Sequence, residues 1–181
     1  MNILIDNKKV SFIENDFPIL IHGVEKSGAS FFSVCLLADL LKDGMKVLLF
    51  SAYPMAKEEF KKQIIGYEDN AIIIDSGEEQ DFINTINNTS DLSERIVLIK
   101  NIDNYSSKLF DAVRDLKLVI FSGDLNKCKF ADELVNKTFA SKILFSPSEK
   151  YPQYDLTGLL KYHGKIFSDK YNGIISLGVE K

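Results

Sequence analysis

Short apolar runs alternate along most of the chain with segments in which apolar residues recur every three or four positions. Runs rich in Val, Ile and Leu, such as KVLLF, RIVLI and KLVIF, are typical of strands buried on both faces of a sheet. The intervening segments have the spacing of amphipathic helices. We expect strands at 18–22, 46–50, 71–74, 95–99, 117–121 and 142–145, and helices at 30–42, 57–65, 79–87, 107–114 and 131–136. This regular alternation predicts a mainly parallel sheet.

The two ends of the chain have a different pattern, that of antiparallel hairpins. The first hairpin turns at Asp6-Asn7, and the second turns at Asn172-Gly173, the strongest short-range hairpin signal. Their strands are expected at 3–5 with 9–13 and at 159–167 with 173–179. The predicted fold is α/β: a doubly wound, mainly parallel sheet flanked by helices, with a C-terminal antiparallel hairpin. We expect a single domain over 1–181, with an N-terminal hairpin (1–16), a core (17–146) and an edge hairpin (147–181).

The composition is that of an ordinary globular domain, with 45% hydrophobic and 27% charged residues in a chain of 181. No apolar run approaches the roughly 20 residues that span a bilayer, and the first residues lack the order of a signal peptide. Cys35 and Cys128 have no metal-ligand spacing, so we expect free thiols, no bound metal at the cysteines and a cytoplasmic location. The net charge of −4 argues against broad nucleic-acid binding.

One stretch, PILIHGVEKSGASFF, has the arrangement of a phosphate-binding loop, in which glycines form a tight path between a strand and a helix N-terminus. Gly23, Gly28 and Ser30 occupy their positions in the Walker A pattern G-x-x-x-x-G-K-[ST]. Ala29 stands where the lysine is expected. Lys26 could reach a phosphate from another direction, although a solvated loop lysine is the simpler interpretation. The candidate phosphate-binding residues are Gly23, Lys26, Ser27, Gly28, Ala29 and Ser30.

This loop resembles that of RecA, and the similarity extends to KaiC-type members of the RecA superfamily over roughly 17–146. Within that range, a Gly-aromatic-acidic turn at Gly66-Tyr67-Glu68 precedes a short apolar strand that ends in Asp75. The resemblance implies a RecA-like P-loop fold, with ATP and Mg²⁺ as the candidate cofactors.

Relatives of this kind carry a pair of glutamates just after the second strand, and one of them activates the attacking water. This sequence has Ala52, Tyr53 and Pro54 in that neighbourhood. Glu58 and Glu59 lie further on, inside a predicted helix, where a solvated surface explains them. We therefore assign no catalytic residue.

The strand that would hold Mg²⁺ is also altered. The Walker B element is an apolar strand that ends in Asp, and RIVLIKNID is the best candidate, but Lys100 and Asn101 replace the acidic pair. Asp103 follows three residues later and is explained equally by a loop. The competing candidate is AIIIDS, which ends in Asp75. Ser122 lies where such ATPases place a polar sensor of the γ-phosphate, and turn chemistry explains it as well.

Aromatic and basic residues alternate in the C-terminal hairpin, where Tyr162, Phe167 and Tyr171 lie among lysines. This interleaving suits single-stranded nucleic acid, whose bases stack on rings, and it suits a protein interface almost as well. A hairpin with one core face and one solvated face also explains it. Because an edge strand offers unpaired backbone groups, we expect a protein partner or self-association through this edge.

Three functions follow from these observations. The first is a RecA/KaiC-like pseudo-ATPase that acts as a binding or scaffolding subunit, with weak or no ATP binding and no efficient hydrolysis. The second is an ATP-binding protein or slow ATPase that uses Lys26 as a displaced lysine. The third is a single-stranded nucleic-acid binder related to RecA paralogues. The altered loop, magnesium strand and glutamate positions favour the first.

Overall fold

The computed structural model describes residues 2–74 and 76–178. The strands in this part of the chain form one sheet in the order β2-β1-β10-β9-β8-β3-β7-β6-β4-β5. They are β1 (Asn2–Ile5), β2 (Lys8–Lys9), β3 (Ile19–His22), β4 (Lys46–Ser51), β5 (Ala71–Ile73), β6 (Arg95–Lys100), β7 (Val119–Gly123), β8 (Ser141–Leu144), β9 (Gly164–Ser168) and β10 (Asn172–Gly178). The α-helices are α1 (Ala29–Lys42), α2 (Pro54–Gln63), α3 (Glu79–Asn88), α4 (Ser107–Val113) and α5 (Ala131–Asn136). None of the described helices is long and apolar enough to cross a membrane.

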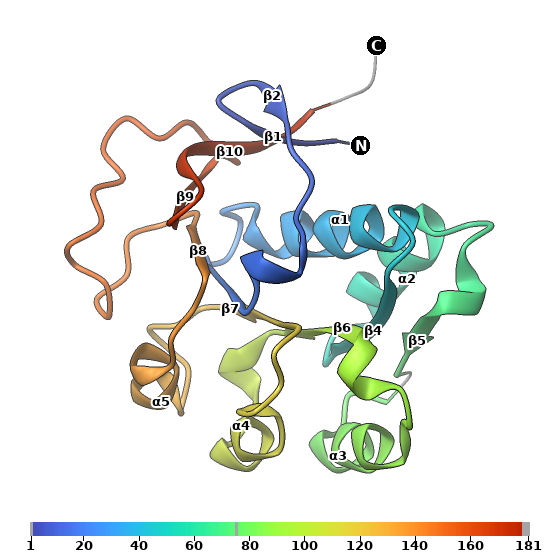
Figure 1. The fold of residues 1–181 in the computed structure, drawn as a ribbon. Coiled ribbons are helices and arrows are strands. Elements are labelled where there is room, and N and C mark those ends of the chain that lie inside the picture. Colours follow the sequence, from blue (N-terminus) through green and yellow to red (C-terminus); the bar gives the residue numbers. More distant parts are fainter. Residues whose placement is uncertain (1, 75, 179–181) are drawn as a thin grey trace.

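The centre of the sheet, β8-β3-β7-β6-β4-β5, is parallel, with α1 and α2 on one face and α3, α4 and α5 on the other (Figure 1). Each face has its own core, and successive strand residues alternate between the two. In β3, Ile19 and Ile21 belong to the core of the α1 face, whereas Leu20 belongs to the other core. On that second face, the rings of Phe50 and Phe82 stack with centroids 4.5 Å apart. The predicted mainly parallel α/β fold is therefore confirmed.

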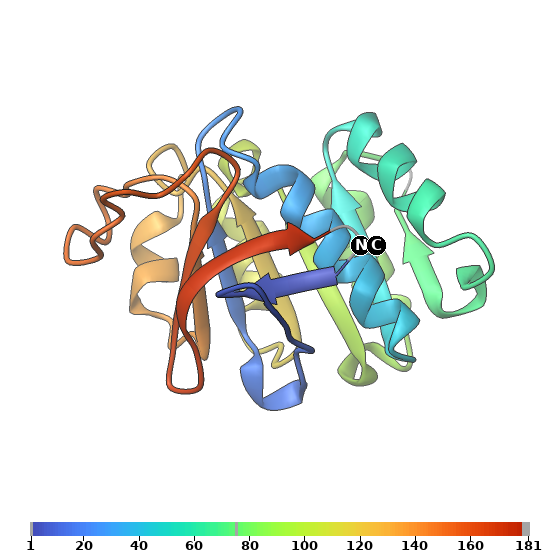
Figure 2. The same ribbon diagram turned by 90° about the horizontal axis from the view of Figure 1, so that it is seen from above.

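At one end the sheet continues with antiparallel strands and curls over α1 (Figure 2). Ile3 and Ile175, from paired strands β1 and β10, pack in the core of the α1 face. The turn predicted at Asp6-Asn7 is confirmed, because both residues have the positive φ angles (48° and 64°) that a two-residue hairpin turn requires. The second strand is limited to Lys8–Lys9, shorter than the expected 9–13.

The C-terminal hairpin differs from its prediction in position and in turn. Its strands are β9 and β10, and the expected turn residues Asn172 and Gly173 are the first residues of β10. The chain instead turns between Ser168 and Tyr171. The Ser168 N–H donates to the Tyr171 carbonyl oxygen at 2.8 Å, and the Tyr171 N–H donates to the Ser168 hydroxyl oxygen at 2.8 Å. Gly173 instead lies against the Asp6 side chain, whose carboxylate oxygen would be 2.3 Å from a Cβ at this position.

The expectation that this hairpin forms the sheet edge is wrong. β10 pairs with β1 from Asn2 to Ile5, and β9 pairs with β8, so both strands lie inside the sheet. The two edges are the two-residue strand β2 at this end of the sheet and β5 at the other. The physical reason is that β1 has apolar residues with no core of their own, and pairing with β10 places Ile3 over α1, where it is buried.

The parallel strands position the candidate site. The segments that follow β3, β4, β6, β7 and β8 all emerge at the carboxyl edge of the sheet, which is the usual location of ligand sites in open α/β sheets. The glycine-containing segment between β3 and α1 belongs to this edge.

Candidate functional site

The segment from Gly23 to Gly28 forms a tight loop between β3 and the first turn of α1, as predicted. Gly28 precedes α1 with φ 99°, a conformation that favours glycine. At Gly23, a Cβ would lie 2.4 Å from the Ser27 hydroxyl and 2.5 Å from the Ala29 Cβ. Both glycines of the pattern are therefore required by the path of the backbone.

The backbone N–H groups of this loop are only partly used within the protein. Gly23 donates to the Gly123 carbonyl at 3.2 Å, and Val24 donates to the Ser146 hydroxyl at 3.0 Å. In the part of the chain that the structure describes, the N–H groups of five loop and first-turn residues have no hydrogen-bond partner: Glu25, Lys26, Gly28, Ser30 and Phe31. Together with the positive end of the helix dipole, such groups can bind an anion.

A buried lysine from β6 lies under the start of this helix. Lys100 is only 1% exposed, and its Nζ donates to the carbonyl oxygen of Ser30 at 2.9 Å and to the Ser30 hydroxyl. Burial lowers the pKa of Lys100 to about 8, and the nearby Asp103 carboxylate raises it in part. The ammonium is therefore still charged at neutral pH, and no carboxylate among the described residues forms an ion pair with it.

The other polar residues at this edge lie around Lys100 without contacting Ser30. Asn101, with φ 61°, accepts a hydrogen bond from the Ser51 hydroxyl at 3.0 Å. Asp103 Oδ1 accepts the Asp124 N–H at 3.2 Å, which directs this oxygen to the end of β7. Ser122 is buried and lies in register with Lys100 on the neighbouring strand. The competing residue Asp75 lies outside the described residues, and its strand β5 pairs with β4 at the far side of the sheet.

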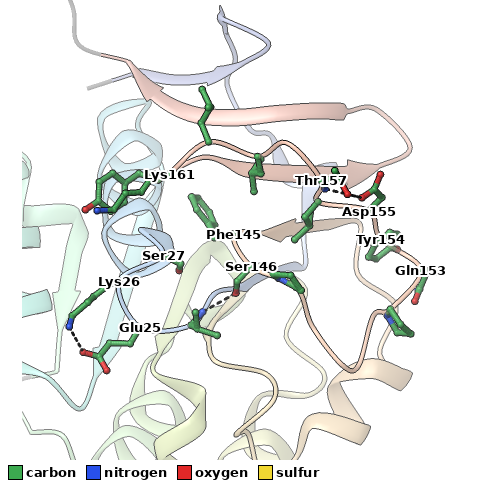
Figure 3. Close-up of a pocket in the computed structure, with 17 residues that line it drawn as sticks. Glu25, Lys26, Ser27, Phe145, Ser146, Gln153, Tyr154, Asp155, Thr157 and Lys161 are labelled. Atoms are coloured by element: carbon green, nitrogen blue, oxygen red, sulfur yellow. Dashed lines mark hydrogen bonds and ion pairs between the residues drawn. The ribbon is translucent and has the colours of Figure 1, made fainter.

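A pocket of about 770 Å³ adjoins the loop (Figure 3). Its walls are the loop itself, the residues that follow β8 and the segment 152–162 that leads to β9. The side chains include apolar groups suited to a flat ring and polar groups suited to a sugar: Phe145, Pro147, Tyr154, Ser27, Thr157 and Lys161. The volume lies within the range of about 300–1,000 Å³ that is usual for small-molecule sites.

Tyr162 connects the pocket to the loop. It has φ 64°, and its Cα and Cδ1 would each lie 3.2 Å from a Cβ added to Gly28. Lys161 lies over the Tyr162 ring at 4.8 Å. Lys26, by contrast, is highly exposed and lies 3.9 Å from Glu25. Neither of these two pocket lysines forms a hydrogen bond with Ser30, whereas Lys100 forms two.

His22 supports the wall of the pocket and does not line it. Burial lowers the pKa of His22 below its usual 6.5. Its Nδ1 accepts the Leu125 N–H at 3.0 Å, and its Nε2 donates to the Pro147 carbonyl at 3.2 Å. This arrangement requires the neutral ring. It connects the end of β3 to the segments that follow β7 and β8. Across residues 2–74 and 76–178 there is no cluster of His, Cys, Asp and Glu that could hold a metal ion.

The three aromatic residues expected to form a partner surface are separated in the structure. Phe167 stacks on Tyr154 with centroids 4.1 Å apart, and Tyr171 packs against Phe12 at 6.0 Å. Tyr162 remains exposed beside the loop.

Two features of the site were not predicted from the sequence. The contact between Lys100 and Ser30 joins residues 70 positions apart, and its only sequence signal is a lysine that ends a fully apolar strand, where lysine is rarely buried. The segment 152–162 has no regular secondary structure, so no periodicity marked it as a pocket wall.

Comparison with known proteins supports the fold. No protein-family model and no curated protein matches the chain. Three solved structures of the genome packaging NTPase B204 from Sulfolobus turreted icosahedral virus 2 are similar over 93% of this chain and 100% of theirs. They contain AMP (15% identity, TM-score 0.62), AMPPCP (14%, 0.60) and ATP-gammaS (16%, 0.63). The chain therefore has a P-loop NTPase fold.

Proposed function

We propose that this chain is a nucleotide-binding domain, a RecA/KaiC-like pseudo-ATPase that binds a nucleoside phosphate and does not hydrolyse it efficiently. The observation that carries the proposal is the junction of the loop and the pocket. Unpaired N–H groups at Lys26, Gly28 and Ser30 offer a site for phosphate, and the adjoining pocket of about 770 Å³ offers room for a base and sugar. The nucleotides in the B204 structures support a nucleotide as the ligand of this fold.

The absence of efficient hydrolysis rests on the residues that replace the catalytic ones. Phosphoryl transfer needs Mg²⁺ held by a carboxylate and a group that orients the attacking water. Lys100 ends the strand next to Ser30, and Ser51 at the end of β4 is bonded to Asn101. The nearest glutamates on α2 are engaged elsewhere, Glu58 with Lys61 at 3.7 Å and Glu59 with Gln63 at 3.1 Å.

Titration with a fluorescent ATP analogue, combined with an assay of phosphate release, tests the proposal. We expect saturable binding and no significant turnover. Lys26→Glu should weaken binding several-fold because it reverses a charge on the pocket wall. Lys117→Glu is the matched control, since Lys117 is exposed and precedes β7 at the opposite end of the strands. Absence of saturation, or equal effects of the two variants, would refute nucleotide binding at this site. Rapid Mg²⁺-dependent turnover would instead favour a working ATPase.

The scaffolding part of the proposal is supported by apolar side chains around the loop. Four exposed apolar residues lie in the loop, in the first turn of α1 and in the segment before β9: Val24, Phe31, Leu160 and Tyr162. Because exposed apolar patches mark interaction sites, we propose that a partner protein or a second copy binds here. Light scattering with and without nucleotide tests this, and a monomer at every concentration would contradict self-association.

A further inference from the structure

In a P-loop site the Ser or Thr hydroxyl at the position of Ser30 ligates Mg²⁺, and a carboxylate at the end of a neighbouring strand holds the metal's hydration shell. Here β6, which is separated from β3 by β7, ends in Lys100, and the Lys100 ammonium donates a hydrogen bond to the Ser30 hydroxyl itself. The hydroxyl that would face the metal therefore accepts a hydrogen bond from a cation.

The residues present do not fit Mg²⁺. A divalent ion bound to Ser30 would lie within a few ångströms of the Lys100 ammonium, in a place where burial weakens the screening of their repulsion. The nearest acidic residue along the strand, Asp103, turns Oδ1 toward the Asp124 N–H. The described residues contain no group of three or more His, Cys, Asp and Glu side chains that could hold a metal in its place.

The site nevertheless has positive charge that Asp103 offsets only in part and that no ion pair among the described residues neutralises. The N-terminus of α1 carries the positive end of a helix dipole. Lys100, buried beside it, has three N–H donors, and both of its acceptors belong to Ser30. A buried ammonium without a carboxylate partner is costly, and an anion at the loop would offset that cost.

We propose that Lys100 replaces the metal, so that the site binds the phosphate groups of a nucleotide in their metal-free form. The proposal rests on the nucleotide site proposed above and specifies its ligand: free ATP or ADP in place of the magnesium complex. Added Mg²⁺ then weakens binding, because it removes the free nucleotide from solution and places a second cation against Lys100.

The test compares binding of ATP by calorimetry in EDTA with binding in excess Mg²⁺, for the wild type and for Lys100→Met. We expect wild-type affinity to be higher in EDTA than in excess Mg²⁺. Lys100→Met should bind at least about ten-fold more weakly in EDTA, the loss expected when one charged hydrogen bond to phosphate is removed. Lys117→Met is the control and should bind as the wild type does. Thermal melts establish that each variant is folded, and Lys100→Gln repeats the comparison with a polar side chain.

Pyrophosphate in EDTA serves as a second probe, because it tests the loop and Lys100 without the base pocket. Binding of ATP only with Mg²⁺, or unchanged binding by Lys100→Met, would overturn the role of Lys100 and leave the nucleotide site intact. Pyrophosphate binding that depends on Lys100, without ATP binding, would uphold the anion site and refute the nucleotide. Failure of both probes under both conditions would refute both proposals.

Discussion

Replacement of Lys100 by methionine should stabilise the free protein. Methionine fills most of the same volume, and it removes a charge that is buried without an ion pair to any described residue. The variant loses two hydrogen bonds to Ser30, but Ser30 is exposed, so water can replace them. The charged lysine is therefore the larger cost in the absence of ligand.

The magnitude follows from the pKa of the lysine. A fall from the ordinary value of 10.5 to about 8 corresponds to about 3 kcal/mol against the charged folded form, at about 1.4 kcal/mol for each pH unit. The lost hydrogen bonds reduce the gain by about 1 kcal/mol. We expect Lys100→Met to raise the free energy of unfolding by about 1–3 kcal/mol at pH 7.

Urea unfolding of both proteins across pH provides the assay. Because the folded pKa of Lys100 lies below the unfolded one, the unfolded wild type binds more protons between about pH 8 and pH 10.5, and its stability rises through that window. The advantage of the variant should thus be complete below pH 8 and shrink toward pH 10.5. In the difference between the free energies of unfolding of the two proteins, the contributions of other groups that titrate in this range cancel. A variant less stable than the wild type at pH 7, or a difference independent of pH, would refute the reasoning.

Three further predictions concern the loop, the histidine and the core. Gly28→Ala should cost about 1–3 kcal/mol in urea unfolding, because φ is 99° and Tyr162 lies against the new Cβ; an unchanged midpoint would contradict this. Because the pKa of His22 is lowered, the free energy of unfolding should fall as pH decreases below 6.5. His22→Asn should reduce that pH dependence. Equal pH profiles of unfolding for the wild type and the variant would contradict the neutral ring. Phe50→Ala should destabilise by about 3–5 kcal/mol, since Phe50 is fully buried and stacks on both Phe82 and Tyr105; a loss below 1 kcal/mol would be inconsistent with this packing.

The sequence predicts the parallel core well because that core is specified locally. Runs such as RIVLI are apolar at every position, and β6 is buried on both faces between two parallel neighbours. The loop glycines were also recognisable, because a positive φ at Gly28 and the close approach at Gly23 each exclude a side chain.

The remaining features depend on contacts between distant residues. The pairing of β1 with β10 joins the two ends of the chain, and nothing local distinguishes it from two separate hairpins. The turn at Ser168 uses a serine side chain in place of the Asn-Gly signal. Lys100 could be recognised as a substitution in the magnesium strand, but its contact with Ser30 depends on how β6 packs under α1.

The most direct test of the account is to map ATP binding by amide chemical shifts in EDTA. We predict that the largest shifts occur at Lys26, Gly28 and Ser30, with smaller ones along 152–162, and that Lys100→Met needs at least about ten-fold more ATP to reach them. A second cavity of about 350 Å³, lined by Ile64 and Ile73 among others, provides an internal comparison. Shifts centred on that cavity, or shifts that require Mg²⁺, would contradict a metal-free nucleotide site at the loop.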